Sequence, residues 1–204
     1  REPQALVFAE DALMRLRLTR RTRTYEAVSD ADIARTIAQE HGLQANADAE
    51  GPTYPVVQQW NLSDLAFLRE RARLINAELW VEGDTLSFRS RGRREGTALT
   101  LVQGNHLVSL SIRADLAHQR SAVKVAGYDV AARGAIEEEA GSAELVADGA
   151  GGRSGPAVLE GAIGAFPSQR TREVPTDADQ ARSWARAELL RRARGFVRLS
   201  GVTR

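Results

Sequence analysis

The sequence predicts an α+β protein, because stretches with helical periodicity alternate with stretches whose apolar residues alternate as they do in strands. Three stretches begin at a capping residue and carry apolar side chains at helical spacing, so we expect helices over residues 29–41, 63–75 and 177–194. Residues 107–113 alternate apolar and polar side chains, which is typical of a half-buried strand. The 204 residues suffice for one large domain or two small ones.

The first region is basic. Residues 4–9 and residues 13–18, where leucine alternates with arginine, predict strands, and the sequence therefore starts inside a sheet. We accordingly expect it to be a piece of a longer protein. A nucleic-acid patch is one interpretation of this arginine stripe. A solvated or interface-facing strand edge is the favoured one, since no aromatic stacking residues lie nearby. The stripe consists of Arg15, Arg17, Arg20, Arg21 and Arg23.

The first predicted helix opens with Ser29 and Asp32, which have the spacing of a capping box. Ile33 and Ile37 form its apolar face, and Gly42 suits the left-handed position after its end. His41, in the last turn, is expected to interact with the helix dipole rather than to bind a ligand.

Residues 58–88 predict a capped helix followed by a hairpin. Ser63 is a good N-cap and Asp64 places a negative charge at the positive end of the helix dipole. Leu68 belongs to the apolar stripe of this helix, and we expect it to be buried. Gly83 and Asp84 fit a two-residue turn between two strands.

Residues 89–96 are rich in arginine and glycine and predict a mobile linker before a strand-rich region that starts at Leu99. The glycine-rich residues 141–156 predict a surface loop. Trp60 and Trp184 lie beside apolar stripes and are expected to be packing anchors. Further extended segments are expected at residues 121–129, 158–160, 173–174 and 196–199, with residues 201–204 trailing off.

No arrangement of residues predicts catalysis, a cofactor or a metal ion. The sequence has no cysteine, and its three histidines lack ligand spacing. The glycine cluster has no phosphate-loop signature, and no nucleophile elbow is present. Glu137, Glu138 and Glu139 form an acidic run that we interpret as a solvated face. No apolar run approaches the ~20 residues that a membrane-spanning helix needs.

Two motifs carry a resemblance to a known family: residues 60–72, Trp-Asn-Leu-Ser-Asp-Leu-Ala-Phe-Leu-Arg-Glu-Arg-Ala, and residues 123–129, Val-Lys-Val-Ala-Gly-Tyr-Asp. The first resembles a helix of the phage late control D family, and the second resembles a strand of that family's second hub barrel. These are baseplate hub proteins of contractile tails, similar to type VI secretion spike (VgrG-like) proteins and to the spikes of extracellular contractile injection systems. The resemblance marks Trp60, Asn61, Ser63, Asp64, Phe67, Leu68, Gly127, Tyr128 and Asp129 as structural motif residues.

Residues 9–17 and the helix from Ala178 to Gly195 are also similar to family segments, in the same order along the chain. The resemblance implies hub-type β-barrel domains joined by a helix–hairpin α/β segment. It places the end of a first barrel at residues 1–27, the α/β insertion at residues 28–96 and a second barrel with a terminal helix at residues 97–204. The sequence stops before the OB-fold and β-helix that form the tip of such spikes.

The resemblance implies a structural, non-enzymatic role. Three full-length copies would form a ring that joins a sixfold tube to the spike and other baseplate proteins, without cofactor, specific nucleic acid or membrane span. Assembly would take place in the bacterial cytoplasm. The residues themselves leave an arginine-rich nucleic-acid-binding module as the main alternative, provided that the arginine stripe forms one open face without acidic compensation. A tail-attached peptidoglycan hydrolase lacks a recognisable catalytic carboxylate pair.

Overall fold

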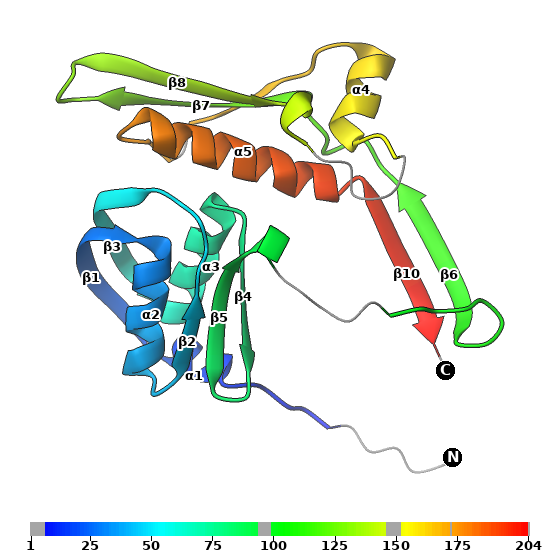
Figure 1. Cartoon of the computed structure of the whole chain (residues 1–204), viewed down its shortest axis with the longest axis horizontal. Coiled ribbons are helices and arrows are strands. Elements are labelled where there is room, and N and C mark those ends of the chain that lie inside the picture. Colours follow the sequence, from blue (N-terminus) through cyan, green and yellow to red (C-terminus); the bar gives the residue numbers. More distant parts are fainter. Residues whose placement is uncertain (1–6, 94–98, 146–151, 172, 204) are drawn as a thin grey trace. The chain divides into compact units, whose positions relative to one another are not determined.

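A computed structural model of the protein describes residues 7–93, 99–145, 152–171 and 173–203. The chain divides after Arg93 into two compact units, which are described separately below (Figure 1). Both units combine helices with strands, so the expected α+β class is confirmed. Within the described residues, none of the four sheets closes into a barrel. The hub-type barrels therefore stay a prediction, as do the domain limits tied to them.

Over residues 7–93, the first unit contains two small sheets and three α-helices. One sheet pairs β1 with β3 in antiparallel fashion. The other has the order β2-β5-β4, with β2 parallel and β4 antiparallel to the central strand. The elements are α1 (Leu13–Leu18), β1 (Arg20–Ser29), α2 (Asp30–Glu40), β2 (Gln44–Ala47), β3 (Thr53–Ser63), α3 (Asp64–Leu74), β4 (Ala77–Glu82), β5 (Thr85–Ser90) and the 3-10 turn η1 (Arg91–Arg93).

Side-chain caps begin the two long helices of this unit, as the sequence predicts. At α2 the capping box is complete: the Asp32 N–H donates to Ser29 Oγ (3.2 Å), and the Ser29 N–H donates to Asp32 Oδ2 (3.0 Å). The Ser29 hydroxyl also donates to Asp32 Oδ2 (2.6 Å), and this bond, the Ser29 N–H and the nearby Arg35 guanidinium hold the pKa of Asp32 below its usual value. At α3 the Ala66 N–H donates to Ser63 Oγ (3.2 Å).

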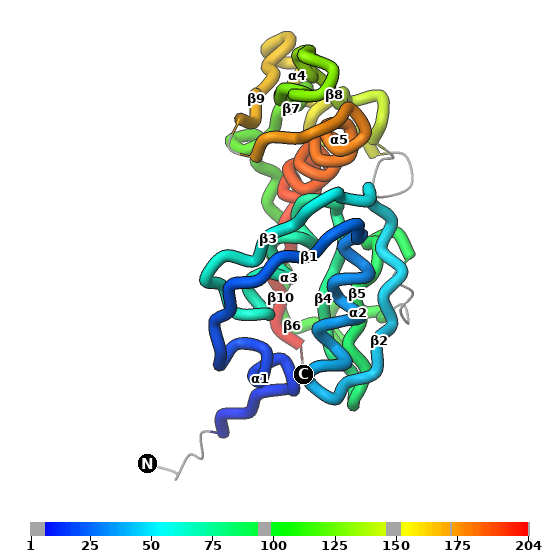
Figure 2. The backbone as a smooth tube through the Cα atoms, turned by 90° about the vertical axis from the view of Figure 1, so that its left-hand side faces the viewer, coloured from blue at the N-terminus to red at the C-terminus, as the bar shows by residue number. Residues whose placement is uncertain are grey.

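The core of the first unit lies between α2, α3 and the three-stranded sheet. Figure 2 shows α2 beside β2 and β5, and its face of Ile33 and Ile37 is buried there. Phe88 from β5 and Leu68 from α3 are fully buried in this unit as well, so the expectation for Leu68 is confirmed. The hairpin β4–β5 turns at Gly83, whose φ of +57° favours glycine.

The second unit is built around its long C-terminal helix. The three-stranded sheet has the order β8-β7-β9, and α5 packs against β7 and β8 (Figure 1). A separate two-stranded antiparallel sheet pairs β6 with β10. The elements are β6 (Leu107–Ala114), β7 (Ala122–Asp129), β8 (Gly134–Gly141), the 3-10 turn η2 (Ser142–Glu144), α4 (Gly155–Ile163), β9 (Ser168–Arg170), α5 (Ala178–Arg194) and β10 (Val197–Thr203).

The structure corrects the prediction of a strand over residues 13–18, which form α1. The alternation of leucine and arginine fits either structure, but Asp11 Oδ1 accepts a hydrogen bond from the Leu13 N–H (3.0 Å) and stabilises the first helical turn. Leu16 is buried, whereas Leu18 is exposed. The strand expected at residues 4–9 is also absent from its described part, residues 7–9, while residues 4–6 lie outside the described chain.

A second group of corrections concerns the second half of the chain. Residues 158–160, expected to be extended, lie in α4, which Ser154 caps by accepting from the Ala157 N–H (3.4 Å). Part of the glycine-rich loop is thus helical, and residues 146–151 lie outside the described chain. No strand forms at Leu99, and β10 runs on to Thr203 where a trailing end was expected.

The predicted linker is ordered in its described part, residues 89–93. Arg89 pairs with Asp48 (3.0 Å), Arg91 pairs with Glu78, and the backbone then forms η1. The Arg89 guanidinium lowers the pKa of the Asp48 carboxyl. Residues 94–96 lie outside the described chain.

Candidate functional site

The motif that begins at Trp60 forms the corner between β3 and α3. Trp60 is 73% exposed, so its expected role as a packing anchor is wrong, because β3 turns Gln59 inward and Trp60 outward. Asn61 adopts a left-handed backbone (φ +48°), and its N–H donates to Thr22 Oγ1 on β1 (3.1 Å). Trp184, by contrast, is buried on α5 as expected.

Asp64, the third polar residue of the motif, is a buried carboxylate that contacts donors from several elements. Its side chain is 1% exposed. Oδ1 accepts from Gln59 Nε2 (2.8 Å) and from Arg23 Nη2 (3.3 Å). Oδ2 lies 3.3 Å from Arg21 Nε and 2.8 Å from His41 Nε2. Asp64 therefore ties α3 to β1, to β3 and to the end of α2, besides opening its own helix.

This arrangement corrects the expectation for His41, which contacts a carboxylate rather than acting only on the helix dipole. Glu40, the residue before it, pairs with Arg23 Nη1 (2.7 Å) and with Arg21 Nη1 (3.6 Å). Two arginines, two carboxylates and one histidine thus form a nearly balanced cluster. The sequence offers no local signal for it, since Arg23 and Asp64 are 41 residues apart.

Phe67 of α3 packs against an aromatic residue of β1 beside the same corner. Its ring stacks on Tyr25 of β1 with the ring centroids 5.9 Å apart, and the Arg23 guanidinium lies over the Tyr25 ring at 5.0 Å. Burial raises the pKa of Tyr25 to about 12. The phenol is therefore neutral across the physiological range and acts as a packing group.

A second buried carboxylate lies at the start of α2. Asp30 is bound by Arg71 of α3 through Nε and accepts a hydrogen bond from the Tyr54 hydroxyl (3.0 Å). The Arg71 guanidinium also covers the Tyr54 ring at 4.3 Å. Burial raises the pKa of Asp30, while Arg71 opposes that shift. The two buried aspartates thus cross-link α2 and α3 with the strands around them.

The arginine stripe does not form the open basic face that nucleic-acid binding needs. Its residues divide between α1 and β1. Arg17 pairs with Glu10 (2.7 Å), and both Arg21 and Arg23 are held by the Asp64 cluster. Carboxylates therefore compensate much of the stripe.

The second motif, on β7, combines a glycine whose position has no room for a side chain with two residues, Tyr128 and Asp129, that are partly exposed. A Cβ on Gly127 would lie 2.4 Å from the Pro175 carbonyl oxygen, so only glycine fits there without a shift. Tyr128 is half exposed. Asp129 Oδ1 accepts from the Ala131 and Ala132 N–H groups (2.9 and 3.0 Å) and thereby stabilises the turn into β8.

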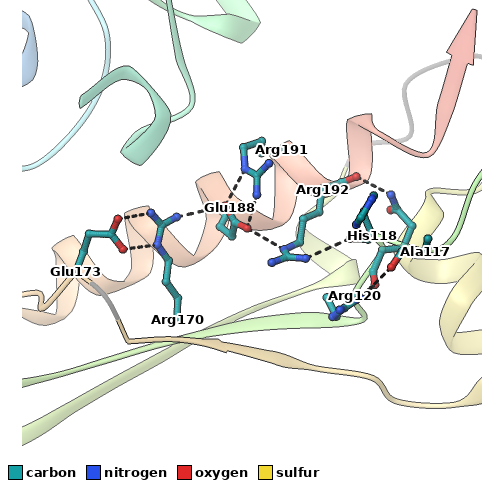
Figure 3. A network of polar contacts seen from close by, with 9 residues as sticks. Ala117, His118, Arg120, Arg170, Glu173, Glu188, Arg191 and Arg192 are labelled. Carbon is teal, nitrogen blue, oxygen red and sulfur yellow. Dashed lines mark hydrogen bonds and ion pairs between the residues drawn. The ribbon is translucent and has the colours of Figure 1, made fainter. Parts of the chain in front are cut away.

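Glu188 of α5 is the centre of an arginine network (Figure 3). It accepts hydrogen bonds from Arg191 (2.6 and 2.8 Å), Arg192 (2.8 Å) and Arg170 of β9 (3.2 Å). Burial opposes ionisation, but these donors, Arg191 foremost, hold the pKa of Glu188 below its usual value. Arg192 also donates to the His118 carbonyl (3.3 Å), so the network links the helix to the segment before β7.

The β6–β10 sheet carries several exposed apolar side chains. Residues directly opposite in this antiparallel pair share a face, which places Ile112 and Leu199 together. They are 63% and 66% exposed. A cavity of about 570 Å³ lies at one end of β10, lined by Leu190, Phe196, Val197 and Leu199 among others.

These features together describe two units held by buried ion pairs, with exposed apolar side chains on the β6–β10 sheet. Within the residues that the structure describes, no three histidine or acidic side chains cluster as metal ligands would. Among those residues, no helix combines the length and the apolar character needed to cross a membrane. The buried carboxylates already accept hydrogen bonds from arginine or amide groups, and so they hold elements together.

Comparison with solved structures gives the class of fold. The chain is similar to the 43 kDa tail protein of prophage MuSo2 from Shewanella oneidensis, with a TM-score of 0.59, 13% identity, and coverage of 87% of this chain and 50% of that one. It is also similar to prophage tail protein gp18 from Listeria monocytogenes EGD-e, with a TM-score of 0.53, 13% identity, and coverage of 93% and 56%. The chain thus spans about half the length of either tail protein and shares their fold over that part.

A comparison of the sequence with models of protein families shows to which family the chain belongs. The model described as the Alg8 N-terminal domain covers residues 1–204, and the chain belongs to that family. This family differs from the late control D family, to which the chain is similar only in the sequence motifs described above. No curated protein sequence matches the chain.

Proposed function

We propose that this chain is part of a structural component of a contractile tail or injection system, and that the full-length protein acts as a trimeric baseplate hub between the tube and the spike tip. The observation that carries the proposal is the fold shared with two prophage tail proteins. The late control D motifs, in family order along the chain, support the more specific hub role.

The distribution of polar groups supports a structural rather than a catalytic role. Asp64, Asp30 and Glu188 each have an arginine, amide, imidazole or hydroxyl group at both carboxylate oxygens. A catalytic carboxylate instead needs a free position from which to reach a substrate. The exposed apolar face of the β6–β10 sheet is the kind of surface that a partner covers.

Threefold assembly would also match the geometry of a tail. Three copies that each contribute two related barrels would present six similar surfaces to a sixfold tube, and symmetric assemblies reuse one patch many times. The partners proposed are therefore further copies of this protein, the tube protein, and spike and baseplate proteins. Assembly would take place in the bacterial cytoplasm, without cofactor or nucleic acid.

Co-expression of the full-length protein with its tube protein tests the proposal. Electron microscopy of the purified product should show the protein as a threefold ring at one end of the tube. A matched preparation without the tube protein controls for aggregation. A protein that is monomeric and does not bind the tube would contradict the hub role. If it also binds DNA with an affinity that falls steeply as the salt concentration rises, the nucleic-acid alternative is favoured.

A further inference from the structure

The β6–β10 sheet is incomplete in its own unit. In the part of the chain that the structure describes, β6 and β10 pair along their length only with each other, and Leu107 at the start of β6 also forms an isolated bridge to Gln103. The outer edge of β10 is therefore open, with unpaired backbone N–H and C=O groups, and the outer edge of β6 is open beyond Leu107. An isolated two-stranded sheet is marginally stable in water. One face carries exposed apolar side chains: Val108, Leu110, Ile112, Val197 and Leu199.

The other face of this sheet carries two neighbouring arginines. Arg113 of β6 lies directly opposite Arg198 of β10, so the two side chains share that face. Like charges in this position repel, and the described residues hold no carboxylate against either guanidinium. A partner that completes the sheet should therefore bring acidic side chains to one face and apolar side chains to the other.

The same unit contains a strand with that pattern. β8 is the outer strand of the order β8-β7-β9, and its far edge is unpaired among the described strands. Glu137 and Glu139 are exposed on one face, where they share the single Lys124 ammonium (3.2 and 3.3 Å), so negative charge is in excess there. That sharing raises the pKa of Lys124.

The opposite face of β8 is apolar and covered by α5. Ile136 and Ala140 are buried on it, and Glu138 between them pairs with Arg182 of α5 (3.2 Å). Apart from the paired Glu138, the face of β8 toward α5 is thus apolar, and the opposite face is acidic, as strand alternation allows.

We propose that the open edge of β8 in one copy pairs with the open edge of β10 in a second copy, because a bridge to Gln103 already occupies the start of the β6 edge. Two independent features select the same orientation. When Glu137 and Glu139 lie on the face of Arg113 and Arg198, the alternation of both strands places Ile136 and Ala140 on the face of Ile112 and Leu199. The apolar face of the ribbon then continues the face that α5 covers in the other copy.

This contact is head-to-tail, because one copy contributes β8 and the next contributes β6–β10. Head-to-tail contacts produce rings when the rotation closes and filaments when it does not. The inference deepens the proposed assembly role and rests on it, since it names the surfaces through which copies of the protein would meet.

Charge reversal on the 204-residue chain tests the contact. Analytical ultracentrifugation should show reversible self-association that weakens as salt is raised. The double variant Arg113→Glu, Arg198→Glu should weaken association at least about tenfold, through like-charge repulsion at each position. The matched control Arg69→Glu, Arg73→Glu reverses two exposed arginines on α3 of the first unit and should associate as the wild type does.

Mixing variants separates a broken contact from a misfolded chain. Glu137→Arg, Glu139→Arg should also fail to self-associate, yet a mixture of the two double variants should form complexes, because each copy then supplies a surface that the other complements. Circular dichroism checks that both variants fold. Double variants that associate like the wild type, a mixture that stays monomeric, or a wild-type chain that is monomeric even at about 1 mM would overturn the inference.

A cysteine trap gives a second readout that does not depend on charge. The chain has no cysteine, so Arg198→Cys and Glu139→Cys each introduce the only thiol of their copy. Oxidation of the mixture should yield a disulfide-linked dimer of the two, whereas Arg198→Cys with Arg69→Cys should not cross-link. If neither mixture cross-links while the full-length protein still forms rings on the tube, this contact is wrong and the proposed function stands.

Discussion

Substitution of Asp64 probes the buried cluster that joins β1, β3, α2 and α3. Asp64→Asn keeps the size of the side chain but removes its charge, while Arg21 and Arg23 remain beside it at 3.3 Å. One amide oxygen then replaces two carboxylate oxygens that together face Gln59, His41 and both arginines. Breaking a buried ion pair by removing one partner costs about 3–5 kcal/mol, and we expect the first unit to lose stability by that amount.

Urea unfolding followed by circular dichroism measures this loss. Asp84→Asn is the matched control, because it makes the same chemical change at an exposed turn of the same unit, and it should change stability by less than about 0.5 kcal/mol. A loss below about 1 kcal/mol for Asp64→Asn would refute the reasoning, since it would mean that the carboxylate is solvated and its partners exchange with water.

Three further predictions concern packing and charge. Leu68→Ala should cost about 2–5 kcal/mol, as for a core leucine, while the exposed Leu18→Ala should cost less than about 1 kcal/mol in the same denaturation assay. Gly127→Ala should cost about 1–3 kcal/mol because its Cβ would meet backbone 2.4 Å away, whereas Gly134→Ala, with open space around it, should not; a thermal shift of equal size in both would contradict this. Because its folded-state pKa is lowered, ionised Glu188 stabilises the fold above its usual pKa of 4.5, and this contribution disappears as the pH falls through the lowered value. The stability difference between the wild type and Glu188→Gln should therefore shrink as acid is added, and a difference that is constant with pH would exclude the network.

The three long helices could be predicted because their signals are local. Ser29, Ser63 and Asp177 cap the helices within three residues of the groups that they bind, and the apolar stripe follows at once. Leu13–Leu18 and Gly155–Ile163 were harder, since a helix of two or three turns shows too little periodicity to separate it from a strand or loop.

The buried networks could not be predicted, because their members come from distant segments. Arg71 and Asp30 are 41 residues apart, and nothing in either local sequence specifies the pair. The exposure of Trp60 depends on which way β3 presents alternate residues once it pairs with β1. The family motif marked this corner through Trp60, Asn61, Ser63 and Asp64, but only the fold separates the outward tryptophan from the buried aspartate.

The mass of the full-length protein in solution tests the central claim of a trimeric structural hub most directly. Native mass spectrometry across a range of protein concentrations and volatile-salt strengths separates a trimer from a monomer without any assumption about shape. The account predicts a trimer that persists on dilution and gives way to monomer as Arg113 and Arg198 are reversed in charge. A protein that is monomeric at every concentration, with or without the tube protein, would contradict it.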